Sequence, residues 1–502
     1  MAKRSSVSRI EGTHRRRIID TFKGEVLSHP ELSLGFGFFW IWVWIVFQND
    51  LLGRIAQFGP VRLSSWAIAL LSYAIGFFVL GLLFKTRRIV PRGKLYVFAL
   101  MLSMSAGALI MLLLGSFDVL DPLLSRALAI TSSFLMGIGT SGLHVEWGRV
   151  FGSRGTRATV IHGIAGTLFA AILYVVLFAL PMQALQLCTP ILPIFCLWPL
   201  RKTLRGNPRL YEHGIKATLF IPWKFIVTSL IQGLSFGVMW SALLLTDQGG
   251  SIMLVNAGSF SLAAIGVCMA ALLFKMDFNH LIYQVGFLTM SIGYVLLACS
   301  GSAISLGSMV NSVGCHFMSV LMWALCVYLI ENRRLSANWV FTWTTGSYIL
   351  GQALGAVIAE SVLDSANAAS SNMSMLAAAM VFVILASALL MLSNNNLRTG
   401  WGMVRPSESD LRADAFDVAC KIVGSEYGLT PREIEILMPL SKGRNRTVIG
   451  DQLLLSPNTV KTHIRNIYQK TGVHSQQELI DLVEREAKPL SYEDDPAPTT
   501  AF

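Results

Sequence analysis

The stretch LSLGFGFFWIWVWIVF, residues 32–47, contains no charged side chain and is the first long apolar segment of the chain. A helix that crosses a bilayer needs roughly 20 consecutive, mostly apolar residues. The residues before it are polar and basic, and no small-residue cleavage site follows it, so a secretory signal peptide is disfavoured. This pattern predicts a retained membrane helix.

The apolar character continues far beyond this first segment. Of the 502 residues, 53% are hydrophobic and only 14% are charged, whereas soluble proteins carry roughly 25% charged residues. The deficit lies between Leu32 and Ser393, which predicts a polytopic membrane module. We expect about twelve spans, of which the sixth is interrupted by prolines: residues 32–49, 64–84, 95–115, 123–143, 158–180, 183–200, 218–245, 251–274, 281–299, 303–330, 337–359 and 373–392.

Basic residues alternate between the loops on the two sides of this module. The N-terminal tail and the loops after even-numbered spans carry most of the Lys and Arg, and the other loops carry few. Positively charged loops stay in the cytoplasm. Since twelve is an even number, we expect both termini to be cytoplasmic, in a bacterial inner membrane, with the basic tail also near lipid headgroups.

The longest central loop, RKTLRGNPRLYEHGIK, residues 201–216, divides the spans six and six. This layout resembles the major facilitator superfamily of transporters, which is built from two six-helix halves. The loop after the second span has Gly81 and basic residues but lacks the acidic residue of that family's signature. The resemblance is weak in detail, and it implies a transporter-like bundle of two six-helix halves.

The chain changes character after Ser393. We predict five regions: a basic tail at 1–30, the membrane module at 31–393, a linker at 394–424, a DNA-binding domain at 425–487 and an acidic, disordered tail at 488–502. The expected fold class is all-α throughout.

Four short helices are expected in the C-terminal domain. Thr430 with Glu433 forms a capping box with Pro431 between them, which starts the first helix, and Gly443 ends it. A second helix covers residues 446–454. Ser456 starts a third, which ends at Gly472, and a fourth covers residues 475–486.

The third helix, in the stretch LLSPNTVKTHIRNIYQKTG at residues 454–472, has an apolar back and a basic front. Val460, Ile464 and Ile467 repeat at helical spacing, and Lys461 and Arg465 lie on the other side. Two short helices joined by a tight turn, the second of this kind, form a helix-turn-helix that reads the major groove of DNA.

The whole stretch LTPREIEILMPLSKGRNRTVIGDQLLLSPNTVKTHIRNIYQKTGVHS, residues 429–475, resembles the LuxR/NarL class of bacterial helix-turn-helix domains. The resemblance implies that the protein forms a homodimer through the fourth helix of this domain. It also implies base contacts from Lys461, Thr462 and Arg465, and phosphate contacts from Arg446, Thr459, Asn466 and Lys470. Double-stranded DNA is thus the expected partner, and RNA polymerase is a further candidate.

This sequence departs from that class at Val448 and Gly450, where the class usually has an acidic residue and then Ala. Glycine inside a helix costs about 1 kcal/mol relative to alanine. We therefore expect the second helix to be marginally stable by itself, without loss of DNA binding.

Polar residues inside the spans are candidate contacts for a small-molecule ligand, because polar groups are costly in lipid. Helix–helix hydrogen bonding or a position at the membrane interface is the alternative role for each. The candidates are His162, Gln232, Asn311, His316 and Gln352, with His144 and Glu146 considered beside them. For the tryptophans Trp40, Trp42 and Trp44, we favour a role in interface anchoring or core packing over a role in a substrate surface.

No catalytic or metal-binding motif is present in the sequence, so we expect no enzymatic activity, cofactor or metal. The favoured hypothesis is a membrane-anchored, one-component transcription regulator that senses an unknown small molecule. A secondary transporter with a regulatory DNA-binding head is the alternative, and a passive membrane tether for DNA is a third possibility.

Overall fold

The computed structural model describes residues 22–48, 65–87, 93–116, 121–206, 221–246, 252–273, 278–299, 304–333, 335–363, 371–391, 416, 419–420, 422–441, 443, 446–453 and 455–492. Most of the predicted basic tail, linker and acidic tail lies outside these residues, as do many of the basic loop residues. The chain folds as two units, residues 1–406 and 407–502. All the elements described in either unit are helical, as expected.

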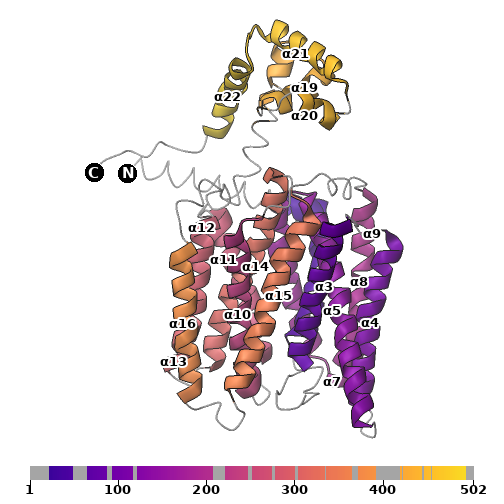
Figure 1. Ribbon diagram of the computed structural model, residues 1–502, viewed down its shortest axis with the longest axis vertical. Helices are drawn as coiled ribbons and strands as arrows, with labels where there is room; N and C mark the ends of the chain where they lie inside the picture. Colours follow the sequence, from indigo (N-terminus) through magenta and orange to yellow (C-terminus); the bar gives the residue numbers. More distant parts are fainter. Residues whose placement is uncertain are drawn as a thin grey trace, which may run out of the picture. The chain divides into compact units, whose positions relative to one another are not determined.

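The first unit is a bundle of long helices, drawn from indigo to orange in Figure 1. Its first half consists of α2 (Pro30–Phe47), α3 (Ser65–Arg87), α4 (Lys94–Ser116), α5 (Pro122–Gly152), α6 (Thr156–Phe178), α7 (Met182–Cys188), η2 (Thr189–Ile191), α8 (Leu192–Phe195) and α9 (Leu197–Gly206). The short pieces α7 to α9 occupy the sixth predicted span. Its prolines break the helix there because proline lacks the backbone donor that a continuous helix needs.

The second half repeats this series of long helices. It consists of α10 (Trp223–Thr246), α11 (Ile252–Val267), η4 (Cys268–Leu273), α12 (Phe278–His280), η5 (Leu281–Gly286), α13 (Phe287–Cys299), α14 (Ile304–Arg333), α15 (Ala337–Val362) and α16 (Ser371–Met391). The elements η4 and η5 are π-helical.

Ten helices among the described residues are long and apolar enough to cross a membrane, against twelve expected. The predicted spans at 251–274 and 337–359 are the two that differ. The apolar part of the first is shorter, Val255–Ala270. The second corresponds to α15, which buries several polar side chains, including Thr342, Ser347 and Gln352. The expected count is therefore approximate.

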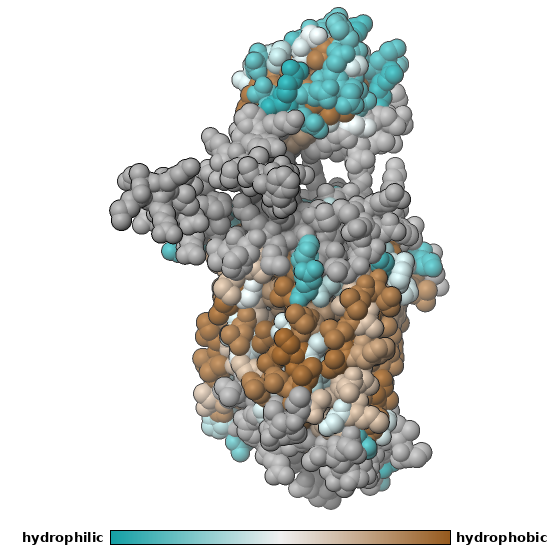
Figure 2. Space-filling model, turned by 90° about the vertical axis from the view of Figure 1, so that its left-hand side faces the viewer, coloured by the Kyte–Doolittle hydropathy of each residue, from teal (hydrophilic) through white to brown (hydrophobic). Residues whose placement is uncertain are grey.

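The outer surface of this unit is apolar. Figure 2 shows a brown band of hydrophobic residues on the face that carries α13 and α16. Leu288, Phe382 and Leu389 on these helices are exposed to 51%, 74% and 76%. An exposed apolar band of this extent fits lipid contact rather than water. The unit is thus a membrane protein module.

Helices α10 and α15 approach each other at four glycines. A Cβ atom on Gly233 or Gly237 of α10 would collide with the backbone oxygen of Tyr348 or Gln352, and one on Gly351 of α15 with that of Leu230. Gly355 has the same relation to Leu234. Both helices thus carry glycines four residues apart, the spacing that lets membrane helices pack backbone to backbone.

The two halves are tied together at opposite ends of α6. Near its start, the backbone N–H and the hydroxyl of Thr156 donate to Glu331 Oε2 of α14, at 3.2 and 2.7 Å. Near its end, the Tyr174 hydroxyl accepts from Asn256 Nδ2 of α11 at 2.9 Å. Because α14 and α11 belong to the second half, both ends of α6 resist separation of the halves.

The second unit contains the four predicted short helices, α19 (Pro431–Ser441), α20 (Arg446–Leu453), α21 (Pro457–Thr471) and α22 (Gln476–Tyr492). Ile436, Leu437, Ile449, Val460 and Ile467 meet in its core.

The core of this second unit also includes residues before the predicted domain boundary at 425. Ala419, Cys420 and Val423 are fully buried against it, in helical backbone. Small and apolar side chains at these positions follow a polar stretch, so composition alone placed them in the linker.

Candidate functional site

Helix α19 of the second unit begins with a reciprocal cap. The backbone N–H of Thr430 donates to Glu433 Oε2 at 2.8 Å, and the N–H of Glu433 donates to Thr430 Oγ1 at 3.3 Å. This is the predicted capping box. The Ser456 hydroxyl accepts from the N–H of Thr459 at 3.2 Å, which caps α21. Gly472 ends α21 in the left-handed conformation, with φ of 69°.

Helix α21 turns one face to the core and the other to solvent. Val460, Ile464 and Ile467 are buried, whereas Lys461 and Arg465 are exposed. Neither of these two cationic side chains has a hydrogen-bond or ion-pair partner among the described residues. They are therefore available to an external anion or to base edges.

Thr462 lies on the same exposed face, and its hydroxyl donates to the backbone oxygen of Asn458 at 3.0 Å. The hydroxyl oxygen can still accept one further hydrogen bond. The three residues expected to read bases thus share one surface.

The residues expected to contact phosphate are arranged less uniformly. Arg446 and Thr459 are exposed, and Asn466 is half-buried. Lys470 is also exposed, but its ammonium donates to Glu433 Oε2 at 2.8 Å and to the backbone oxygen of Gly428 at 3.0 Å. These bonds use two of its three N–H groups, so a phosphate contact by Lys470 would rely on the third.

Glu433 is 3% exposed and bonds to both Thr430 and Lys470. Burial raises the pKa of this carboxyl, but the hydrogen bonds from Lys470 and Thr430 lower it more, so the pKa lies below its ordinary value. A buried carboxylate is tolerated only when it is paired in this way. The pair joins the first turn of α19 to the last turn of α21.

The close approach of α20 to the turn explains Gly450. A Cβ atom there would lie 2.9 Å from the backbone oxygen of Leu455, and the Leu455 N–H donates to the Gly450 oxygen at 2.9 Å. Glycine lowers the stability of a helix, but at this position it also has a packing role. It leaves room for the turn between the two helices of the motif.

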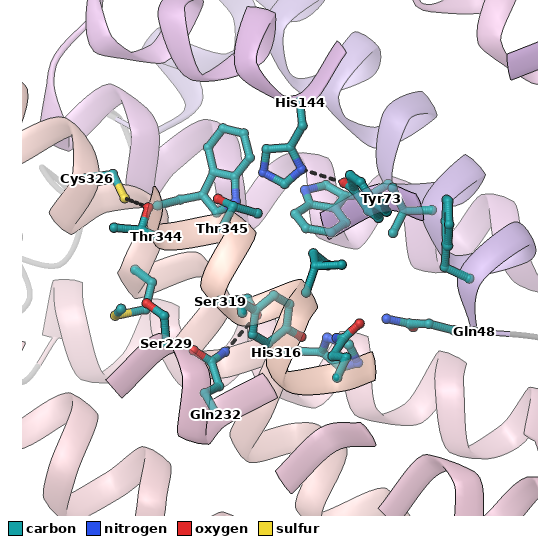
Figure 3. Close-up of a pocket in the computed structure, with 18 residues that line it drawn as sticks. Gln48, Tyr73, His144, Ser229, Gln232, His316, Ser319, Cys326, Thr344 and Thr345 are labelled. Carbon is teal, nitrogen blue, oxygen red and sulfur yellow. Dashed lines mark hydrogen bonds between the residues drawn. The ribbon is translucent and has the colours of Figure 1, made fainter. Parts of the chain in front are cut away.

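The membrane unit contains a cavity between its two halves, shown in Figure 3. About 670 Å³ around its lining residues is not filled by atoms, which includes space open to solvent. Its lining comes from α2, α3 and α5 of the first half and from α10, α14 and α15 of the second. Trp40, Tyr73, Trp323 and Tyr348 supply aromatic walls. None of the described residues that line it is Asp, Glu, Lys or Arg.

Two buried histidines face this cavity from opposite halves. His144 of α5 is 2% exposed, and its Nδ1 lies 2.8 Å from the Tyr73 hydroxyl. His316 of α14 is 6% exposed and packs against Phe260, with 4.1 Å between ring centroids. Nε2 of each imidazole has no hydrogen-bond partner among the described residues. Figure 3 shows the two rings on opposite walls.

Gln232, His316 and Gln352, predicted as candidate ligand contacts, line this cavity, as does His144. The amide of Gln232 already donates to the oxygen of Cys315 at 2.9 Å and to Ser319 Oγ at 3.0 Å. These four residues lie on four different helices, α5, α10, α14 and α15, so the fold brings them together.

His162 and Asn311 do not reach this cavity. His162 Nδ1 bonds Ser33 Oγ at 2.8 Å, and its Nε2 lies 3.5 Å from Glu25 Oε1. The amide of Asn311 donates to Ser235 Oγ at 3.0 Å and to the Met290 oxygen at 3.1 Å. Both residues thus make the helix–helix contacts that were the alternative role.

Glu146 is fully buried and forms an ion pair with Arg149 on the same helix. Trp42 is also fully buried and donates to Thr140 Oγ1 at 3.0 Å, whereas Trp40 lines the cavity. Among the tryptophans, Trp42 therefore packs in the core, whereas Trp40 contributes to the cavity wall.

Sequence reasoning missed Tyr73 and Tyr348, which supply hydroxyl groups to the cavity lining. A polar-capped aromatic residue inside a span is a usable signal, because a buried tyrosine hydroxyl needs a partner. The glycine pairs on α10 and α15 were a second signal, since they fix the helices that carry part of the lining.

Residues 428–483 match the family model described as bacterial regulatory proteins, luxR family (GerE). Over 64 residues the chain is 38% identical to the HTH-type transcriptional regulator MalT of Serratia proteamaculans and to that of Yersinia pestis. The aligned part is 13% of this chain and 7% of each relative. The chain therefore spans only a small part of the length of these relatives.

Two solved structures are similar over most of this chain. The human organic anion transporter MFSD10 (TETRAN) aligns with a TM-score of 0.51 and 11% identity, over 73% of this chain and 99% of that one. A bacterial homologue of the iron transporter ferroportin, in an outward-facing state, aligns with a TM-score of 0.50 and 17% identity, over 74% and 97%. At such identities the likeness concerns the fold alone.

These comparisons confirm the two expected resemblances. The second unit contains a LuxR-family helix-turn-helix domain, a DNA-binding domain of transcription regulators. The first is a membrane module with a transporter-like fold. The luxR family and the two transporters reported above are not enzymes.

Proposed function

We propose that this protein is a membrane-anchored, one-component transcription regulator whose membrane module senses a small molecule. The observation that carries the proposal is the fusion, in one chain, of an exposed cationic recognition helix and a bilayer module. Between the halves of this module lies a largely aromatic cavity with a few polar side chains. The two parts supply an output and a candidate input without a second protein.

The DNA-binding part of the proposal rests on α21. Lys461, Thr462 and Arg465 would contact base edges, while Arg446, Thr459, Asn466 and the remaining N–H of Lys470 would contact phosphates. Helix α22 would pair two copies, so that a dimer reads two half-sites. RNA polymerase would be a further contact of the promoter-bound dimer.

The sensing part rests on the cavity. A ligand shifts an equilibrium between two conformations only when it binds one of them more tightly. A molecule that contacts His144 in one half and His316 in the other has an affinity that depends on how the halves are placed. Ligand binding would thereby shift the population of module conformations, and the module would pass this change to the DNA-binding domains through their pairing or orientation.

The proposal requires both termini to lie in the cytoplasm of a bacterium, on the inner membrane, as the loop charges indicate. A reporter fused after Phe502 tests this. A fluorescent protein that matures only in the cytoplasm should be active there, and an active periplasmic phosphatase fusion would overturn the proposal.

Mapping of genomic binding sites tests the output. Arg465→Ala and Lys461→Ala should each weaken occupancy about 5- to 150-fold, which corresponds to about 1–3 kcal/mol per base-reading contact. Arg126→Ala is the control, because Arg126 is an exposed arginine on α5, outside the DNA-binding unit. Unchanged transcript levels of the bound genes after deletion of the gene would contradict a regulatory role.

A secondary transporter with a regulatory head is the second candidate, favoured by the transporter-like fold and the cavity between the halves. Uptake into vesicles that contain the purified protein separates the two. A receptor binds its ligand without concentrating it, whereas a carrier accumulates it when an ion gradient is applied. A set of target genes that responds to no compound would instead favour a passive tether.

A further inference from the structure

We infer that the cavity between the two halves takes an uncharged, ring-containing small molecule that presents a hydroxyl group to each of the imidazoles of His144 and His316. This inference rests on the proposed sensing function and names the chemistry of its ligand.

We expect the ligand to be uncharged because of the side chains that line the cavity. The described residues around the cavity include no acidic side chain and no Lys or Arg. An ionised group moved from water into such a site would lose its hydration without gaining a counter-charge, which is strongly unfavourable. A neutral molecule does not meet this penalty.

We expect the ligand to contain a ring because the cavity has aromatic walls. Trp323 stacks on His144 with 4.7 Å between ring centroids and 29° between planes, and Trp40 lies 6.3 Å from Trp323. Tyr73 and Tyr348 add further aromatic surface to the lining. Flat aromatic walls gain most from a flat apolar molecule, through offset or edge-to-face contact.

We expect the ligand to carry hydroxyl groups because each of the two imidazoles has a nitrogen without a partner. Nε2 of His144 and Nε2 of His316 are buried without a partner among the described residues, and unpartnered buried polar atoms are costly. A neutral imidazole is a donor at one nitrogen and an acceptor at the other, and the tautomer of His144 depends on whether Tyr73 donates to Nδ1 or accepts from it. A hydroxyl group satisfies Nε2 in either tautomer, since it both donates and accepts.

A third polar atom supports a ligand with more than one polar end. Oε1 of Gln48, in the cavity lining, is also buried without a partner among the described residues. The three atoms belong to different helices or helix ends: the end of α2, α5 and α14. One molecule that bonds to His316 and to either of the other two atoms bridges the halves, so its binding is sensitive to their separation.

Equilibrium dialysis of the full-length protein in lipid nanodiscs tests this inference with four probes of one ring system: naphthalene, 2-naphthol, 2,6-dihydroxynaphthalene and 2,6-naphthalenedicarboxylate. Empty nanodiscs correct for partitioning into lipid. Each hydroxyl group should tighten binding by about 2- to 10-fold, the range for one net hydrogen bond. The dicarboxylate should bind more weakly than naphthalene.

Variants that replace a histidine with an aromatic ring without nitrogens show which histidine is responsible for the gain in affinity from each hydroxyl group. His144→Phe and His316→Phe should each remove one hydroxyl-dependent step and leave naphthalene binding within about two-fold. His144→Gln and His316→Gln should recover part of the loss. His162→Phe is the matched control, a buried histidine outside this cavity. Size-exclusion profiles show which variants fold.

Equal binding of naphthalene and the diol, or tighter binding of the dicarboxylate, would overturn the inference. Because no DNA is present in this assay, its outcome is separate from the proposed function. If the diol series fails while compounds of another chemistry change promoter output, sensing stands and the ligand class is wrong. If the series behaves as expected but no bound compound changes transcription, the ligand class stands and sensing is wrong.

Discussion

Lys470 Nζ lies 2.8 Å from Glu433 Oε2, which joins the last turn of the recognition helix α21 to the first turn of α19. Glu433 also caps its own helix through Thr430. One carboxylate thus fixes both the start of the scaffold and the end of the DNA-facing helix. The relationship gives Lys470 a structural role that its exposed position in the sequence pattern does not reveal.

We expect Lys470→Met to lower the free energy of unfolding of the fragment 407–502, which has a hydrophobic core of its own, by about 1–2 kcal/mol, because Glu433 would lose its cation. Urea denaturation followed by circular dichroism measures this. Lys461→Met is the control: it removes a lysine that has no described partner, so stability should change by less than about 0.5 kcal/mol. Equal effects of the two changes would refute the structural role.

The stability of this fragment should depend on pH through Glu433. Burial raises the pKa of this carboxyl, but its hydrogen bonds lower the pKa more, so the net pKa lies below the ordinary value. Its contribution is therefore present above the ordinary carboxyl pKa of about 4.3 and is lost as pH falls through the lower folded pKa. The difference in unfolding free energy between the natural fragment and Glu433→Gln should be largest near neutral pH and shrink below about pH 4.5. A difference that stays constant from pH 7 to pH 3 would show that the carboxylate charge is unimportant.

Gly450→Ala should destabilise the fragment even though alanine is the better helix former. Alanine gains about 1 kcal/mol in helix propensity, but its Cβ would lie 2.9 Å from the Leu455 oxygen, and overpacking costs about 1–3 kcal/mol. We expect a net loss of up to about 2 kcal/mol in urea denaturation. A gain in stability would show that the turn adapts without cost.

In the membrane module, Gly351→Ala should separate α10 from α15 and lower the melting temperature of the purified protein in detergent. The added Cβ would collide with the backbone oxygen of Leu230, which cannot rotate away as a side chain can. Gly24→Ala is the control, since nothing lies within 4 Å of a Cβ placed there. Melting curves from size-exclusion profiles after heating give the comparison, and similar curves for both variants would argue against a close glycine contact.

Thr156→Val should loosen the two halves at one end of α6. The change removes the hydroxyl bond to Glu331 while keeping the side-chain shape. A loss of about 0.5–1.5 kcal/mol raises an open population by roughly 2- to 12-fold. The readout is the rate at which N-ethylmaleimide labels Cys326 in the cavity lining, with the other six cysteines replaced by serine.

Thr203→Val is the matched control for this labelling, because the Thr203 hydroxyl bonds only to Pro199 of its own helix among the described contacts. If both threonine changes alter the labelling of Cys326 equally, the Thr156–Glu331 contact does not hold the halves together.

Several features of this protein follow from the sequence because they depend on neighbouring residues. Thr430 and Glu433, Ser456, and Gly472 are local signals for helix ends, since each acts on backbone groups within a few residues. The apolar segments predict membrane helices for the same reason, as each span must satisfy its own backbone hydrogen bonds in lipid. The exposed face of α21 follows from helical periodicity and the surrounding motif.

The tertiary structure decided the features that depend on residues far apart in the chain. Whether His144 and His316 face one cavity while His162 and Asn311 tie helices together depends on packing between helices, which a single span does not encode. The same holds for Lys470, whose cation is positioned by Glu433 37 residues away, and for Gly450, whose space is taken by a turn. The sequence by itself determined which segments are helical, apolar or basic, because these properties are local; only the fold decided which side chains meet, because such contacts are set by the combined packing of all the helices.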